Sequence, residues 1–210
     1  MRAAGVRAIN INEGDEVVGV RLTNGHNEIL LANRNGRAVR FDENDVRTMG
    51  RVSTGVIGMR LDGGDDEVVG MVCVNDPNVE TIMVVSENGY GKRSEVEDYR
   101  KTNRGTKGVK TLAVTEKTGR LVAIKVVTDE NDLMIINKSG ILIRLKVADV
   151  RVMGRATQGV RLINLAKKND TIASVCKVMS SQEEDVEEAE VLNEEEPNAD
   201  SQGTPVIDVE

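Results

Sequence analysis

Three arginines close to glycines have the residue type and spacing that could bind a phosphate. Arg51, Arg104 and Arg155 each stand four residues before a glycine, in the stretches RVSTG, RGTKG and RATQG. A cation beside glycines and a hydroxyl group lets main-chain amides and a side-chain oxygen approach phosphate oxygens closely. We therefore expect phosphate contacts in these loops, resting chiefly on Arg104 and Lys107 of RGTKG.

A second set of arginines recurs inside predicted hairpins. Each follows a turn glycine by four residues and precedes an aspartate by five. Two interpretations stay open: the arginines form a row of phosphate contacts, or they are structural and pair with the recurring aspartates Asp45, Asp98 and Asp149. Lysines add charge in the central repeat. The full set of candidate phosphate contacts is Arg40, Arg51, Lys92, Arg93, Lys101, Arg104, Lys107, Lys110, Arg144 and Arg155.

No constellation of catalytic residues is recognisable. The only histidine, His26, falls in a predicted loop, and no phosphate loop of the Walker type occurs. Asp42, Asn44 and Asp45 lack the loop length and terminal glutamate of an EF-hand, so turn chemistry explains them better. We expect no cofactor or metal in this chain.

The aromatic residues limit the kind of nucleic acid that could bind. Phe41, Tyr90 and Tyr99 are the only aromatic side chains, too few for a platform on which single-stranded bases stack. No recognition-helix pattern is present either. A nucleic-acid partner would therefore be bound through its phosphates, which favours duplex DNA held by its backbone and its ability to bend.

These residues are carried by an internal repeat. Gly-Val pairs occur at Gly5, Gly55, Gly108 and Gly159, at spacings of 50, 53 and 51, and the hairpin glycines Gly36, Gly89 and Gly140 are spaced by 53 and 51. Such periodicity indicates a repeat protein. The units are predicted at residues 1–49, 50–101, 102–153 and 154–179, about three and a half repeats. The chain opens inside a repeat, which predicts a fragment.

Each unit is predicted to contain four strands, the first opened by the Gly-Val pair. Asn-Gly or Ser-Gly turns then join a hairpin. Four antiparallel strands per unit predict an all-β array of propeller-like blades. The second strands are predicted at Val17–Leu22, Val68–Val74, Leu121–Val127 and Ile172–Val178, and the hairpins at Glu28–Asn33 with Arg37–Phe41, Thr81–Ser86 with Tyr90–Ser94, and Leu133–Asn137 with Ile141–Lys146.

Charge is divided unequally along the chain. The first 180 residues hold all 28 Lys and Arg with 23 of the 35 Asp and Glu, a net charge of +5, whereas residues 181–210 hold the other twelve acids. A basic array with an acidic tail points to nucleic acid as partner. The tail, residues 180–210, is predicted to be disordered. It is either a solubilising extension or an internal competitor for the cationic surface.

Two further features bear on location. Cys73 and Cys176 fall in predicted buried strands without CxxC spacing, which predicts reduced core thiols of a cytoplasmic protein. No apolar run is long enough for a membrane helix, so we expect no membrane association.

The units GRVSTGVIGMRL, ENGYGKRSEVEDY, RGTKGVK and GRATQGV resemble the C-terminal domain of DNA gyrase A, from about Gly5 to Val178. The resemblance implies a β-pinwheel, usually of about six propeller-like blades that exchange strands, whose rim wraps duplex DNA with a positive superhelical sense. It implies as partners the rest of gyrase A, together with gyrase B, in an A2B2 heterotetramer of the bacterial cytoplasm. That type II topoisomerase introduces negative supercoils with ATP and Mg, which would be bound elsewhere.

This sequence departs from the family pattern in one respect. The family's box Gln-Arg-Arg-Gly-Gly-Lys-Gly is absent, and the nearest stretch is Thr102–Gly108. Neither Tyr90 nor Tyr99 matches the context of the tyrosine that attacks DNA. The resemblance thus implies part of an enzyme without its chemistry. The C-terminal domain of topoisomerase IV and a non-catalytic protein-interaction scaffold remain alternatives.

Overall fold

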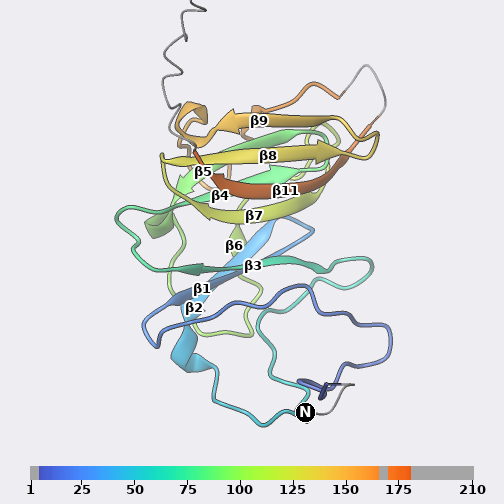
Figure 1. Cartoon of the computed structure of the whole chain (residues 1–210), viewed down its shortest axis with the longest axis vertical. Helices are drawn as coiled ribbons and strands as arrows, with labels where there is room; N and C mark the ends of the chain where they lie inside the picture. Colours follow the sequence, from blue (N-terminus) through green and yellow to red (C-terminus); the bar gives the residue numbers. More distant parts are fainter. Residues whose placement is uncertain (1–4, 166–169, 181–210) are drawn as a thin grey trace, which may run out of the picture. The chain divides into compact units, whose positions relative to one another are not determined.

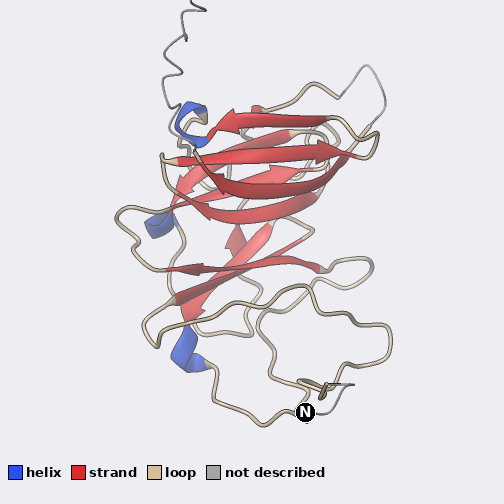
Figure 2. Ribbon diagram, in the orientation of Figure 1, coloured by secondary structure: helices blue, strands red, loops and turns tan. Residues whose placement is uncertain are grey.

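The computed structural model describes residues 5–165 and 170–180, and this part of the chain is all-β, as predicted (Figure 2). Three single-turn 3-10 helices, and no α-helix, accompany its strands. The strands are β1 (Glu28–Asn33), β2 (Arg37–Asp42), β3 (Val68–Val74), β4 (Thr81–Ser86), β5 (Tyr90–Glu95), β6 (Val109–Lys110), β7 (Leu121–Val127), β8 (Asn131–Asn137), β9 (Leu142–Lys146), β10 (Val160–Arg161) and β11 (Ile172–Met179); the 3-10 helices are η1 (Glu43–Asp45), η2 (Val96–Asp98) and η3 (Val147–Asp149).

The three predicted hairpins are confirmed. β1 pairs with β2, β4 with β5 and β8 with β9, all antiparallel. Their turns need a residue with positive φ, and Gly36, Gly89 and Gly140 supply it with φ of 76°, 79° and 84°. The Asn-Gly and Ser-Gly pairs therefore determine where each hairpin folds back.

The grouping of strands into sheets follows the exchange of strands that the resemblance implies, because the strands of one predicted repeat unit are divided between sheets. Each hairpin pairs with the long strand that follows it in the chain, so β3 joins β1, β7 joins β4 and β11 joins β8. The short Gly-Val strands β6 and β10 each skip the nearest earlier hairpin and pair with the hairpin before it, on β2 and β5 respectively. The sheet orders are β3-β1-β2-β6, β10-β5-β4-β7 and β11-β8-β9.

This exchange explains why three predicted strands do not form. Residues 17–22 and the Gly-Val pairs at Gly5 and Gly55 have no strand conformation. Each would pair with a hairpin that stands earlier than β1, and the described residues contain none. A strand without a neighbour leaves its main-chain groups and apolar side chains in water, and Leu22 is accordingly 97% exposed.

The strands β3, β7 and β11 lie side by side where the three sheets meet, with β7 in the middle (Figure 1). At Gly70 in β3 the absence of a side chain leaves room for Ile124 of β7, because a Cβ on Gly70 would lie 2.9 Å from Ile124 Cγ2. Cys73 in β3 is partly buried, and burial raises the pKa of its thiol. Cys176 in β11 is exposed, so the prediction that it is a core thiol was wrong.

The described residues form a compact unit that ends at Ser180. Its core consists of clusters between adjacent sheets, the largest built around Leu30, Ile82, Tyr99 and Leu112. The acidic segment that was predicted to be disordered lies, apart from Ser180, outside the described residues. Within the part of the chain that is described, no helix has the length and apolar character needed to cross a bilayer.

Candidate nucleic-acid interface

Arg104, in the glycine-containing loop after η2, is held in place by main-chain oxygens. Its Nε donates a hydrogen bond to the carbonyl oxygen of Asp45 at 3.0 Å, and its Nη1 donates to that of Ile57 at 3.0 Å. The loop itself is fixed by main-chain hydrogen bonds from Gly105 to Gly58 and from Arg60 to Thr106. Because carbonyl oxygens carry no net charge, the guanidinium is oriented while its positive charge stays uncompensated.

Arg155 repeats this arrangement one repeat later. Its Nε donates to the carbonyl oxygen of Asp98 at 2.9 Å, and its Nη1 donates to that of Lys110 at 2.8 Å. The recurrence of both contacts shows that the anchored loop arginine is a feature of the repeat itself. Arg51, the third of these loop arginines, is exposed and forms no hydrogen bond or ion pair with the described residues.

A third row of arginines was missed in the sequence. Arg47, Arg100 and Arg151 stand two residues after the recurring aspartates, at spacings of 53 and 51, so the repeat period could have revealed them. All three are exposed, and no side-chain hydrogen bond or ion pair engages them within the described residues. Their charges are therefore available to a ligand.

The tertiary structure places the two rows together. Arg104 is bonded to Asp45, two residues from Arg47, and Arg155 is bonded to Asp98, two residues from Arg100. The connectors after the first two hairpins thus each carry one exposed arginine of their own and receive one from a loop later in the chain. We call Arg47 with Arg104, and Arg100 with Arg155, the paired-arginine sites.

The hairpin arginine Arg40 is structural. Its side chain is 5% exposed and forms ion pairs with Glu28 at 2.5 Å and Glu97 at 2.9 Å. Its Nη1 donates to the carbonyl oxygens of Val96 and Tyr99, which ties the first hairpin to η2. Burial alone would lower the pKa of Arg40, but the hydrogen bonds to Glu97 and Glu28 outweigh it and raise the pKa.

The other two hairpin arginines also pair with acids, but not with the predicted ones. Arg93 is buried and pairs with Asp129, and Arg144 pairs with Asp132 at 2.6 Å. Of the two interpretations left open, a structural role thus describes these arginines, but their partners are not Asp45, Asp98 and Asp149. The carbonyl groups of Asp45 and Asp98 are instead the anchors of the loop arginines.

Lys92 lies inside the protein and does not present its charge at the surface. Its side chain is fully buried, and its Nζ donates to the carbonyl oxygen of Gly154 at 2.8 Å and to Ser94 Oγ at 3.3 Å. Burial lowers the pKa of Lys92 to about 8. The neighbouring repeats carry Val39 and Ile143 at this place, so the buried amine is special to the second hairpin.

The remaining lysines of the central repeat differ in how far their charge is neutralised. Lys101 is paired with Asp42 at 2.8 Å and with Glu28 at 3.2 Å. Lys107 is 61% exposed but pairs with Asp62 at 2.8 Å, and this hydrogen bond lowers the pKa of Asp62. The side chain of Lys110 is exposed and makes no such pair with a described residue.

Other kinds of site have little support. Phe41, Tyr90 and Tyr99 are all buried, so none offers a face on which a base could stack. Within residues 5–165 and 170–180, no group of His, Cys, Asp and Glu side chains has the arrangement of a metal site. The surface that remains is a set of positioned, uncompensated arginines.

The repeat also identifies the family. The sequence pattern of the DNA gyrase C-terminal domain, a β-propeller, matches residues 1–24, 27–75, 80–128 and 131–176. The chain belongs to this family. The last three matched segments each run from a hairpin to the long strand that pairs with it, so the gyrase C-terminal repeat coincides with the sheets of the structure.

Individual relatives agree with this assignment. The chain is 46% identical over 183 residues to DNA gyrase A of Staphylococcus aureus (strain NCTC 8325 / PS 47). The aligned region covers 87% of this chain and 20% of that protein. It therefore spans about a fifth of the length of the curated relatives it matches. A solved C-terminal domain of DNA topoisomerase IV matches with a TM-score of 0.77 at 29% identity (82% of this chain, 53% of that one), and a solved DNA gyrase A C-terminal domain with 0.75 at 28% (84% and 59%).

Proposed function

We propose that this chain binds and wraps duplex DNA through its phosphates, along the paired-arginine sites. The observation that carries the proposal is the anchoring of Arg104 and Arg155 by neutral carbonyl groups, which orients two guanidinium groups and leaves their charge for a ligand. Arg47 and Arg100 complete these sites, and Arg51, Lys110 and Arg151 extend the surface. Contacts of this kind fix DNA in place without reading its sequence.

The relatives supply the wider role. As part of gyrase A, the chain would work with gyrase B in an A2B2 assembly in the bacterial cytoplasm. The whole enzyme would use ATP and Mg, bound outside this chain, to introduce negative supercoils. Membership of the gyrase C-terminal family and the 46% identity to a gyrase A protein support this role.

A role in topoisomerase IV is the second candidate, because a solved domain of that enzyme matches with a TM-score of 0.77. The higher identity to gyrase A favours gyrase. Ligation of nicked circular DNA in the presence of the chain tests the wrapping itself: we expect a positive change in linking number that grows with protein concentration. Binding without any such change would leave a DNA-binding domain that does not wrap.

The test of phosphate binding is a titration of duplex DNA at several salt concentrations. The logarithm of the binding constant should fall by about 0.9 per phosphate contact for each tenfold rise in salt, so contacts to about five phosphates predict a slope of −4 to −5. A slope near zero would refute the proposal and support a protein-interaction scaffold. Single-stranded DNA of the same length should compete poorly.

A further inference from the structure

The choice of strand partner in this fold is unexpected from the connections. Only six residues separate β3 from β4, and three separate β7 from β8. Consecutive strands joined by such short loops usually pair with each other. Here β3 pairs with β1 and β7 pairs with β4. Each hairpin therefore pairs with the long strand that follows it in the chain and not with the one that precedes it.

The residues where hairpin and long strand meet occupy one equivalent position in every sheet. The residue two before the turn glycine donates its main-chain N–H to the carbonyl oxygen of the residue just before the long strand. These hydrogen bonds are 2.8 to 2.9 Å long. The facing pairs are Arg34 with Glu67, Glu87 with Arg120, and Lys138 with Thr171.

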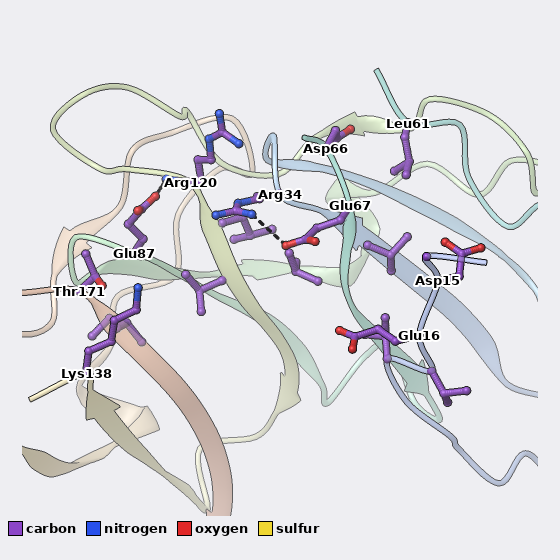
Figure 3. A pocket seen from close by; sticks show the side chains of 18 residues that line it. Asp15, Glu16, Arg34, Leu61, Asp66, Glu67, Glu87, Arg120, Lys138 and Thr171 are labelled. Carbon is purple, nitrogen blue, oxygen red and sulfur yellow. Dashed lines mark hydrogen bonds and ion pairs between the residues drawn. The ribbon is translucent and has the colours of Figure 1, made fainter. Parts of the chain in front are cut away.

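The side chains of these facing pairs line a cavity of about 860 Å³, where Figure 3 shows them. Arg34 and Glu67 form an ion pair of 3.0 Å. Glu87 accepts a hydrogen bond from the main-chain N–H of Arg120 at 2.8 Å; an ion pair with Asp65, and also the charge of Glu87, raise the pKa of Arg120. Both charged pairs are therefore complementary in the observed pairing.

The alternative pairing would be repulsive at both places. If the hairpin β4–β5 took the preceding strand β3, Glu67 would face Glu87. If the hairpin β8–β9 took β7, Arg120 would face Lys138. The sign of the charge at the hairpin position changes from Arg34 to Glu87 to Lys138, so a preceding strand meets a like charge in both cases.

We propose that these alternating charges select the strand partner of each hairpin. Exposed ion pairs contribute little to the stability of a finished fold, and the side chains of Arg34 and Glu67 are 39% and 63% exposed. A choice between two competing strands during folding depends only on the difference in interaction energy between the two pairings. Here the observed pairing brings opposite charges together, whereas the competing pairing brings like charges together.

Steric fit acts in the same direction at the neighbouring position. Gly119 has a φ of +70°, and a Cβ there would lie 2.8 Å from Glu87 Cγ. The segment before β3 carries Asp66 at the equivalent place, and the Asp66 carboxylate accepts hydrogen bonds from Asn33 Nδ2 and from the main-chain N–H of Asn35 in the first hairpin. The second hairpin therefore has room for β7 and not for β3.

The test is the refolding rate of the whole chain from urea at low salt, in variants that separate pair strength from partner choice. The double variant R34E/E67R keeps an opposite-charge pair in the observed sheet, but it also creates attraction between residue 67 and Glu87. We expect an unchanged urea midpoint and refolding that is about threefold slower, because exposed pairs of this kind change rates and equilibria by small factors.

The change E87Q supplies the matched control, because a Gln oxygen can still accept the hydrogen bond from Arg120. In the R34E/E67R background it should restore most of the lost rate, whereas in the natural background it should give no acceleration. Both effects should disappear at 1 M salt, where charges are screened within about 3 Å. An effect of E87Q that is the same in both backgrounds would overturn the proposal.

Disulfide cross-linking during refolding identifies the strand with which β3 pairs. Cys73 of β3 lies opposite Ile29 of β1, and the 53-residue spacing would place it opposite Ile82 in the competing pairing. With Cys176 changed to Ser, I29C should form a disulfide with Cys73, and I82C should form more disulfide in the R34E/E67R background than in the natural one. An equal yield for I82C in both backgrounds would contradict partner selection by charge.

Discussion

The guanidinium of Arg104 donates a hydrogen bond to the carbonyl oxygen of Asp45, 59 residues earlier in the chain. The recurring aspartate therefore serves through its main chain, and the arginine keeps its full charge. Arg155 and Asp98 stand in the same relation one repeat later. The predictions below follow from this arrangement and from the buried cations beside it.

Replacing Arg104 and Arg155 together by Ala should weaken duplex binding for all sequences equally and reduce the salt slope by about 2. Each substitution also removes two hydrogen bonds to carbonyl groups, at a cost of about 1 kcal/mol per bond in the free energy of unfolding. The control is R104K with R155K, which keeps the charge and loses the fork of two donors. Salt titrations and urea unfolding measure the two effects. Unchanged DNA affinity in the alanine variant would remove these residues from the interface.

Changing Arg47, Arg100 and Arg151 to Gln should weaken DNA binding without altering stability. The three side chains are exposed and unbonded within the described residues, so each change should alter the free energy of unfolding by no more than about 0.5 kcal/mol. The salt slope should fall by nearly 3. Lys177, an exposed cation of β11, is the control, and K177Q should leave the slope almost unchanged. A reduction of the slope by K177Q that is one third of the reduction in the triple variant would indicate an effect of net charge alone.

Arg40→Ala should be strongly destabilising. It would leave Glu28 with Lys101 as its remaining partner and the carbonyl groups of Val96 and Tyr99 without their donor in a buried place, and breaking a buried ion pair costs about 3–5 kcal/mol. Glu97→Gln is the milder control, because the side chain of Glu97 is 72% exposed. Urea unfolding at neutral pH measures both. A loss below about 1 kcal/mol for Arg40→Ala would show that the ion pairs and hydrogen bonds of Arg40 contribute little to the free energy of unfolding.

Lys92 should make stability depend on pH. Its pKa is about 8 in the folded chain and 10.5 when unfolded, so the unfolded chain binds more protons between these values and stability rises with pH across that window. The full effect is about 3 kcal/mol. Because burial raises the pKa of Tyr99 to about 12, loss of stability from that group begins above pH 10. The comparison is therefore between the natural chain and K92M from pH 7 to 10. Parallel profiles would disprove the assignment.

Removal of the residues after Ser180 should tighten DNA binding, most clearly at low salt. The first 180 residues carry +5 and the removed segment −12, and a tethered chain of this length competes at an effective concentration on the order of millimolar. Exposed charges are screened within about 10 Å at 0.1 M salt, so the effect should fade there. If the shortened chain binds DNA no better than the intact chain at any salt concentration, the segment serves only as a solubilising extension.

The sequence alone determined the local elements of this protein. Asn35-Gly36 and Asn88-Gly89 demand a positive φ wherever they stand, and alternating apolar residues define a strand without reference to its neighbours, so the three hairpins and the strands at Val68–Val74 and Leu121–Val127 were predicted within a residue or two. The repeat period likewise predicted where the loop arginines Arg51, Arg104 and Arg155 stand in the chain.

Only the tertiary structure decided what each element pairs with. The partner of a strand depends on the relative energies of distant competitors, so local patterns predicted a strand at Val17–Leu22 although the described residues hold no hairpin to receive it. The same holds for charge. Arg40 and Arg104 look equally cationic in the sequence, but Arg40 packs against two carboxylates while Arg104 packs against carbonyl groups. Whether each charge is neutralised depends on those neighbours, and the fold brings Glu97 to Arg40, and the carbonyl groups of Asp45 and Ile57 to Arg104, from other repeats.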